Sequence, residues 1–245
     1  PCDETFTPGI CNRLYRNTSG IVLCGKNLAS ARELSSRIAG RDIVKRYMCI
    51  VRGIINEDQR ISGYLVKNEE SNTVTVTSEP DPDAAEIITY YKPVKISGMD
   101  QDPGFTLLEV DLITGKSHQI RAHLASSGHP LIGDTKYGDE KVNACFRDKY
   151  KLRSQLLHAA EVEFSGMTGI LGYLNGKIIQ APLPHVFARI QKDIFKEKDV
   201  KIIEIKRGSL IVCIALNYLI KEKFENTNKK YKRYNYKQSN NSPKR

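Results

Sequence analysis

One stretch of the chain constrains its fold more than any other: residues 115–138, which read GKSHQIRAHLASSGHPLIGDTKYG. Its middle has the pattern of a short helix, because Ile120 and Leu124 stand one turn apart on an apolar side. Ser117 is the expected N-cap and Gly128 the expected end. Backbone N–H groups ahead of the first turn favour an anion such as a phosphate, although the same pattern fits an ordinary surface helix followed by a loop.

A second motif lies near the start of the chain. Residues 12–20 read NRLYRNTSG, and the apolar run 21–24 follows. Thr18, Ser19 and Gly20 are typical turn residues. The pattern predicts a loop and a turn that lead into a buried strand at 21–24.

Both stretches resemble motifs of the RluA-type RNA pseudouridine synthases. Residues 115–138 are similar to a motif that this family writes as Gly-Arg-Thr-His-Gln-Ile-Arg with a Gly-His-Pro and Gly-Asp tail. Residues 12–20 are similar to the signature Arg-Leu-Asp-x-x-Thr-Ser-Gly. The resemblance runs from about Gly9 to Phe187. It implies an α+β fold, with a mixed, mainly antiparallel sheet and flanking helices, as in the pseudouridine synthase catalytic domain.

The resemblance also implies roles for residues of this chain. Arg121 would lie in the catalytic cleft, where the family's arginine pairs with a catalytic aspartate. Tyr47, in a KRY motif followed by V-x-G, would stack on the target base and handle a proton. Leu157, in a match to Leu-His-Ala, would line the uracil pocket. The implied substrate-binding residues besides Leu157 are Arg13, Thr18, Ser19, Gly20, Lys116, His118 and Gln119. Lys116 keeps the charge of the family's arginine but loses its planar fork.

Tyr15 departs from the family pattern, because it stands at the position of the catalytic aspartate. The family's reaction detaches uracil from ribose and rejoins it through carbon, which needs an ionised carboxylate near the sugar or base. A phenol with an ordinary pKa near 10 is only about 0.1% ionised at neutral pH, and it offers one oxygen where a carboxylate offers two. Asp134 and Asp42 are candidate substitutes, but nothing in the sequence places either carboxylate at that point. We therefore predict an inactive or badly impaired synthase.

The rest of the chain up to residue 164 reads as further helix and strand patterns. Residues 28–38 have apolar side chains at helical spacing, with Asn27 as the expected cap and Gly40 as the expected stop. β-Branched and aromatic runs predict strands at 45–51, 73–77, 87–94, 105–112 and 156–164. We expect the strands of the middle region to pair antiparallel.

The resemblance divides the chain into three parts. Residues 1–190 are expected to form the catalytic domain without the family's opening segment and without the S4 domain that often precedes it. Residues 191–225 are an extension of unassigned structure, and residues 226–245 are a basic tail predicted to be disordered. Residues 229–245 hold seven Lys and Arg residues and no acid, so most of the net charge of +10 comes from this end. The tyrosines among these cations would also suit stacking on single-stranded bases.

Composition argues against several other classes of protein. Six cysteines are scattered without zinc-ligand spacing, so we expect reduced thiols. His118 and His123 are five residues apart and would lie on different sides of a helix, so we expect no metal site. The resemblance to the pseudouridine synthases implies that no cofactor is needed. The longest apolar run, 210–220, is too short to span a bilayer, and no signal-like run opens the chain. These features predict a cytoplasmic protein that is not held in a membrane.

Two functions remain open at the level of sequence. One is an RNA pseudouridine synthase that binds a structured rRNA or tRNA and flips a uridine into the cleft. The other is a non-catalytic RNA-binding remnant in which Tyr15 blocks the chemistry. A weaker third alternative is a fragment that does not fold alone. The sequence does not show which RNA is bound, nor the oligomeric state, for which a monomer is the default expectation.

Overall fold

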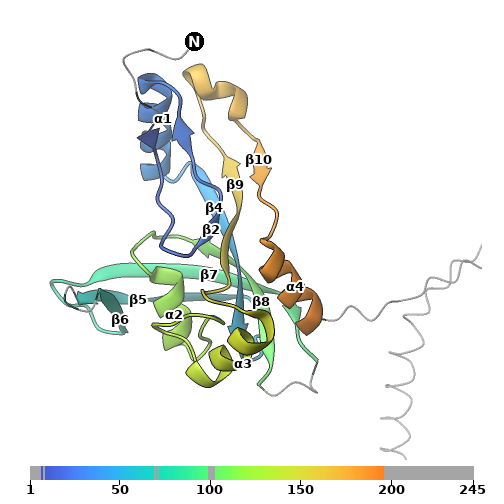
Figure 1. The fold of residues 1–245 in the computed structure, drawn as a ribbon. Helices are drawn as coiled ribbons and strands as arrows, with labels where there is room; N and C mark the ends of the chain where they lie inside the picture. Colours follow the sequence, from blue (N-terminus) through green and yellow to red (C-terminus); the bar gives the residue numbers. More distant parts are fainter. Residues whose placement is uncertain (1–6, 8, 69, 71, 99–102, 196–245) are drawn as a thin grey trace, which may run out of the picture. The chain divides into compact units, whose positions relative to one another are not determined.

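An eight-stranded, mainly antiparallel sheet forms the framework of the protein (Figure 1). The computed structural model describes residue 7 and residues 9–68, 70, 72–98 and 103–195. The strands follow the order β10-β9-β4-β8-β7-β5-β6, and β2 pairs with β9 in parallel. Their bounds are β2 (Ser19–Gly20), β4 (Ile43–Arg52), β5 (Gln59–Asn68), β6 (Thr73–Thr77), β7 (Ala85–Ile96), β8 (Phe105–Leu112), β9 (Leu157–Phe164) and β10 (Ile178–Gln180). This mixed sheet with flanking helices confirms the expected α+β class.

Helices cover the sheet, and a small second sheet stands beside it. The helices of the described part are α1 (Leu28–Ala39), α2 (Gln119–Ser126), α3 (Glu140–Tyr150), α4 (His185–Ile194) and the 3-10 helix η1 (Gly169–Leu174). Strands β1 (Gly9–Ile10) and β3 (Cys24–Gly25) form the second sheet and pair antiparallel. In Figure 1, α1 lies near one end of β4 and β9, and α2 and α3 lie near the other end.

The central part of the main sheet is buried on both of its faces. Leu107 and Leu108 are adjacent in β8, so their side chains point to opposite faces, and both are almost fully buried. Leu107 belongs to a cluster with residues of α3 and α4, whereas Leu108 belongs to one with Ile120 and Leu124 of α2. We infer that α2 covers one face while α3 and α4 cover the other. This arrangement lays the stretch 115–138 against the central strands.

Helix α1 confirms the prediction from its capping residue. The Asn27 side chain accepts a hydrogen bond from the Ser30 backbone N–H (2.8 Å), and the Ser30 side chain accepts one from the Asn27 backbone N–H (3.2 Å). This reciprocal capping box fixes where the helix begins. The helix ends at Ala39, next to the expected stop at Gly40.

The expected turn and strand around residues 18–24 are wrong. The turn lies earlier, where the Thr18 backbone N–H donates to the carbonyl of Tyr15 (2.9 Å). Ser19 and Gly20 instead form β2, because their backbone pairs in parallel with β9. Of residues 21–24 only Cys24 belongs to a strand, and its side chain is exposed.

Several expectations fall wholly or partly outside the described residues. The tail 226–245 and most of the extension 191–225 lie there, so the three-part division of the chain stays a prediction. Helix α4 spans residue 190 and packs into the core through Phe187, Ile190 and Ile194. The four cysteines of the described part are free: Cys11, Cys24, Cys49 and Cys145. Within the same part, no helix is both long and apolar enough to cross a membrane.

Candidate active site

A small cavity, which we call the slot, collects most of the residues singled out in the sequence. Its free volume is about 50 Å³. It is bounded by the loop before β2, by β4, β8 and β9, and by the start of α2. The predicted site residues that line it are Arg13, Tyr15, Thr18, Tyr47, Lys116, His118, Gln119, Arg121 and Leu157. The fold thus joins residues from opposite ends of the described sequence, although their chemical roles stay predictions.

Helix α2 does not begin as predicted, because Ser117 is not its N-cap. His118 takes that position in the left-handed region, with φ 57°, and no side chain caps the helix. Gln119 bonds the preceding loop instead: its amide oxygen accepts from the Thr114 hydroxyl (2.9 Å) and from the Lys116 backbone N–H (3.0 Å). The first turn therefore uses one of the backbone donors that we expected to face an anion.

Gln119 also ties this loop to the sheet. Its amide nitrogen donates to the Ile88 carbonyl (3.0 Å) and to the Thr89 hydroxyl (3.1 Å). The side chain is only 2% exposed, so both ends of a buried amide are bonded within the protein. These bonds fix the position of α2 relative to β7.

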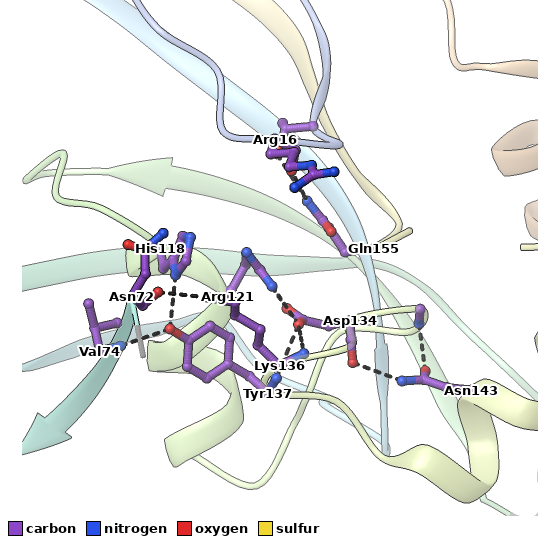
Figure 2. Close-up of polar contacts among 12 residues, drawn as sticks. Arg16, Asn72, Val74, His118, Arg121, Asp134, Lys136, Tyr137, Asn143 and Gln155 are labelled. Carbon is purple, nitrogen blue, oxygen red and sulfur yellow. Dashed lines mark hydrogen bonds and ion pairs between the residues drawn. The ribbon is translucent and has the colours of Figure 1, made fainter. Parts of the chain in front are cut away.

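Arg121 reaches the slot from α2, but its charge is paired with Asp134 (Figure 2). Nε donates to Oδ2 and a terminal nitrogen donates to Oδ1, both at 2.6 Å. The two side chains are 8% and 0% exposed. Burial alone would raise the pKa of the Asp134 carboxyl, but hydrogen bonds from Arg121 and from the backbone of Lys136 and Tyr137 outweigh it and lower the pKa. Asp134 is therefore ionised at neutral pH and holds the guanidinium in place.

Tyr15 stands at the other side of the slot, on the loop before β2. Its hydroxyl donates a hydrogen bond to the Ser117 hydroxyl. Its ring meets His118 edge to face, with 4.7 Å between the ring centres. Burial, then the positive charges of Arg121 and Lys136, lower the pKa of His118, so this imidazole is neutral at pH 7. Tyr15 thus contacts the start of α2 through a hydroxyl and a ring.

Tyr47 and Leu157 form the apolar wall of the slot. They come from neighbouring strands, β4 and β9, and are 8% and 6% exposed. Both belong to the core cluster that holds Ile120 of α2. Burial raises the pKa of the Tyr47 phenol, so this side chain is neutral at pH 7. An apolar wall with one aromatic ring is the surface expected beside a flat base.

Ser19 and Gly20 do not line the slot, although the motif singled them out. The Ser19 hydroxyl lies 2.8 Å from Nδ1 of His158. Gly20 has φ +120°, and a Cβ there would lie 2.2 Å from the carbonyl oxygen of Ala159. Only glycine permits this approach of the loop to β9. Both residues position the loop that carries Tyr15.

Among the described residues that line the slot there is no Asp or Glu. Asp134 lies behind Arg121 and is fully buried. Asp42 forms an ion pair with Arg37 (3.0 Å) and does not line the slot. Neither carboxylate is therefore placed to act in the slot as the aspartate that the resemblance leads us to expect. Within the described part, no group of three or more His, Cys, Asp or Glu side chains could hold a metal ion.

Sequence reasoning missed two residues that shape the site. The sequence suggested Asp134 only as a substitute for the family's catalytic aspartate, and it suggested no role for Tyr137. The ring of Tyr137 lies 5.1 Å from the Arg121 guanidinium, and its hydroxyl lies 2.9 Å from Nδ1 of His118. Both residues lie in the Gly-Asp and Tyr-Gly part of the stretch 115–138. A buried arginine without a partner would be costly, and this could have directed attention to the nearest acid in the motif.

Comparison with known proteins shows which family this sequence matches. The model of the RNA pseudouridylate synthase family matches residues 2–126. The tRNA pseudouridine synthase C of Vibrio vulnificus is 33% identical over 159 residues, which are 62% of this chain and 64% of that protein. The ribosomal large subunit pseudouridine synthase C of Buchnera aphidicola is 30% identical over 186 residues, which are 76% of this chain and 56% of that protein. The chain therefore spans less than two thirds of the length of these relatives.

Two solved human structures share the fold at low sequence identity. RNA pseudouridylate synthase domain containing 1 aligns with a TM-score of 0.58 and 21% identity, over 73% of this chain and 69% of that one. RNA pseudouridylate synthase domain containing 4 aligns with a TM-score of 0.59 and 20% identity, over 75% and 74% of the two chains.

Proposed function

We propose, from the premise that this chain belongs to the RNA pseudouridylate synthase family, that its slot is a uridine site whose catalytic step is impaired by Tyr15. In this proposal the substrate class is structured RNA, either rRNA or tRNA, and the reaction is the isomerisation of uridine to pseudouridine. No cofactor is needed, because an acid or base and a base-stacking wall suffice for the chemistry.

One observation carries the proposal: Tyr15 lines the same slot as Arg121, Tyr47 and Leu157. A uracil ring placed there would have the Tyr47 ring and the Leu157 side chain as its apolar wall. The acid that should act on the sugar or base would come from position 15. The Tyr15 side chain has no carboxylate to offer for this step, and no carboxylate lines the slot among the described residues.

A second candidate function, RNA binding without catalysis, is favoured by two further observations. Arg121 already has two short hydrogen bonds to Asp134, so its charge is compensated without a carboxylate at position 15. The slot has room for only a few water molecules, so a uracil ring could enter only if the walls moved apart. Both observations describe a site that is stable in the absence of catalysis.

The test compares pseudouridine formation by the unaltered chain and by its Tyr15→Asp variant in a uridine-containing rRNA or tRNA. We expect turnover only from the variant, because aspartate restores the ionised group and is smaller than tyrosine. Turnover by the unaltered chain would refute the impairment. If both proteins bind RNA and neither forms pseudouridine, the non-catalytic alternative replaces the synthase proposal.

We also propose that the protein acts in the cytoplasm and is a monomer. rRNA and tRNA are abundant in the cytoplasm, so a protein of this function would act there. The monomer expected from the sequence belongs to the same proposal and is tested by sedimentation at micromolar concentration.

A further inference from the structure

A second and larger cavity lies on the other side of Tyr15, and the uridine proposal does not use it. We call it the polar cavity. Its free volume is about 540 Å³, which lies within the range of sites that hold small ligands. It shares Tyr15, His118 and Arg121 with the slot. Its other walls come from the loops that hold Arg16 and Lys136, from Asn72 between β5 and β6, and from Gln155 before β9.

The charge of the polar cavity is positive. Arg16, Arg121 and Lys136 line it, and no Asp or Glu does among the described residues. Asp134 compensates the charge of Arg121, and Arg16 and Lys136 place two more cationic side chains at the wall. Lys136 is held at the wall, because its Nζ donates to the carbonyl of Asn72 (2.8 Å). The lowered pKa of His118, due in part to Arg121 and Lys136, is consistent with a positive potential here.

The wall also offers groups that recognise a base. Tyr15 is 40% exposed, so ring surface remains available beyond its edge contact with His118. The exposed Asn17 lines the same cavity, as does the buried Gln155. The amide of Gln155 donates to the Arg16 carbonyl (3.0 Å), which fixes this part of the wall (Figure 2). Figure 2 also shows Arg16 and Gln155 lying across from His118 and Arg121.

We propose that the polar cavity binds one unpaired nucleotide of the RNA, with its base stacked on Tyr15 and its phosphate between Arg16 and Lys136. An aromatic ring beside cations is the combination that single-stranded nucleic acid uses, because bases stack and phosphates are neutralised. In this arrangement Tyr15 separates the nucleotide in the polar cavity from the uridine slot. The inference rests on the proposed function for the identity of the ligand as RNA.

The experiment measures the affinity of the full chain for uridine 5′-monophosphate and for uridine by calorimetric titration. We expect Tyr15→Ala to weaken both ligands about tenfold, which is the effect of losing one stacked base. Tyr15→Phe keeps the ring and should stay within about twofold of the unaltered chain. Arg16→Gln and Lys136→Gln should each weaken the monophosphate about fivefold or more, but leave uridine nearly unchanged.

The chain contains a matched control pair outside the cavity. Tyr173 is 65% exposed, and the Lys177 ammonium lies 5.4 Å from the centre of its ring. Tyr173→Ala and Lys177→Gln should leave both affinities unchanged. Because Arg16, Lys136 and Tyr15 are exposed, thermal melts of these variants should match that of the unaltered chain.

Three results would overturn the inference. The first is an unchanged or tighter affinity in Tyr15→Ala, which would place the ligand in the slot that this variant enlarges. The second is equal weakening of uridine and its monophosphate by Arg16→Gln. The third is no binding of the monophosphate at millimolar concentration. Pseudouridine formation by Tyr15→Asp is measured separately, so failure of the proposed function and failure of this inference are distinguishable.

Discussion

The two sides of the slot are fixed by different means. On the helix side, side chains hold one another: Arg121 is bound by Asp134, and Tyr137 contacts Arg121 and His118. On the loop side, the loop is fixed through its backbone, since Ser19 and Gly20 pair with β9. The side chains of Arg13, Tyr15 and Arg16 on that loop are exposed.

This difference explains how a tyrosine can stand where a carboxylate is expected. The loop keeps its path through backbone bonds that do not depend on the side chain at position 15. Asp134 neutralises the positive charge of Arg121, which has no carboxylate partner at position 15. A change of the side chain at position 15 should therefore leave the fold intact, whereas loss of a charge on the helix side should not.

The largest expected effect on stability comes from Asp134→Asn. The amide keeps the shape of the side chain but leaves the Arg121 guanidinium buried without a counter-charge, which costs about 3–5 kcal/mol. Urea unfolding monitored by circular dichroism measures this change. Glu140→Gln is the control, because its ion pair with Arg147 is exposed, and it should produce no measurable change. Similar losses in the two variants would refute the importance of the buried pair.

The loop side should be sensitive to its backbone instead. Gly20→Ala places a methyl group against the carbonyl of Ala159 and should lower the free energy of unfolding by about 1–3 kcal/mol. Gly172→Ala is the matched control, since a Cβ there meets nothing within 4 Å. If the two variants unfold at the same urea concentration, the loop is not held by this close approach.

A smaller effect is expected from pH. Burial lowers the pKa of His118, His123 and His158. Between their folded pKa values and the unfolded value near 6.5, the unfolded state binds more protons, so the free energy of unfolding falls as pH drops below about 6.5. His158→Gln removes one of these groups and should reduce the difference in stability between pH 7.5 and pH 5.5. An identical pH dependence in this variant and in His185→Gln, an exposed control, would contradict the assignment.

Much of the fold follows from local patterns in the sequence. β6 and β8 have the predicted bounds, which follow their runs of β-branched, aromatic and other apolar residues. α1 was predictable from Asn27 and the spacing of its apolar residues. β5 was not predicted, since Gly63 lies in its middle and weakens the strand pattern. Its pairing with β6 and β7 makes it a strand, and that pairing depends on tertiary structure.

The sequence predicted most of the residues that line the slot, but not the hydrogen bonds between them. The resemblance named nine of the residues that line the slot. It could not show that Arg121 turns to Asp134, because the choice of partner depends on which carboxylate is buried beside it. For the same reason, the sequence could not show that Gln119 bonds the loop before α2 while Ser117 leaves the helix uncapped. Hydrogen bonds between side chains at a helix start are set by packing against β7.

The most direct test of the account replaces Tyr15 by two side chains of nearly equal shape, Asp and Asn, and measures the single-turnover rate of pseudouridine formation in the same RNA. Only Asp provides an ionised oxygen in the slot, so we predict turnover by Tyr15→Asp and none by Tyr15→Asn or the unaltered chain. Equal rates for the Asp and Asn variants would show that the slot needs only space at position 15, and would contradict the account.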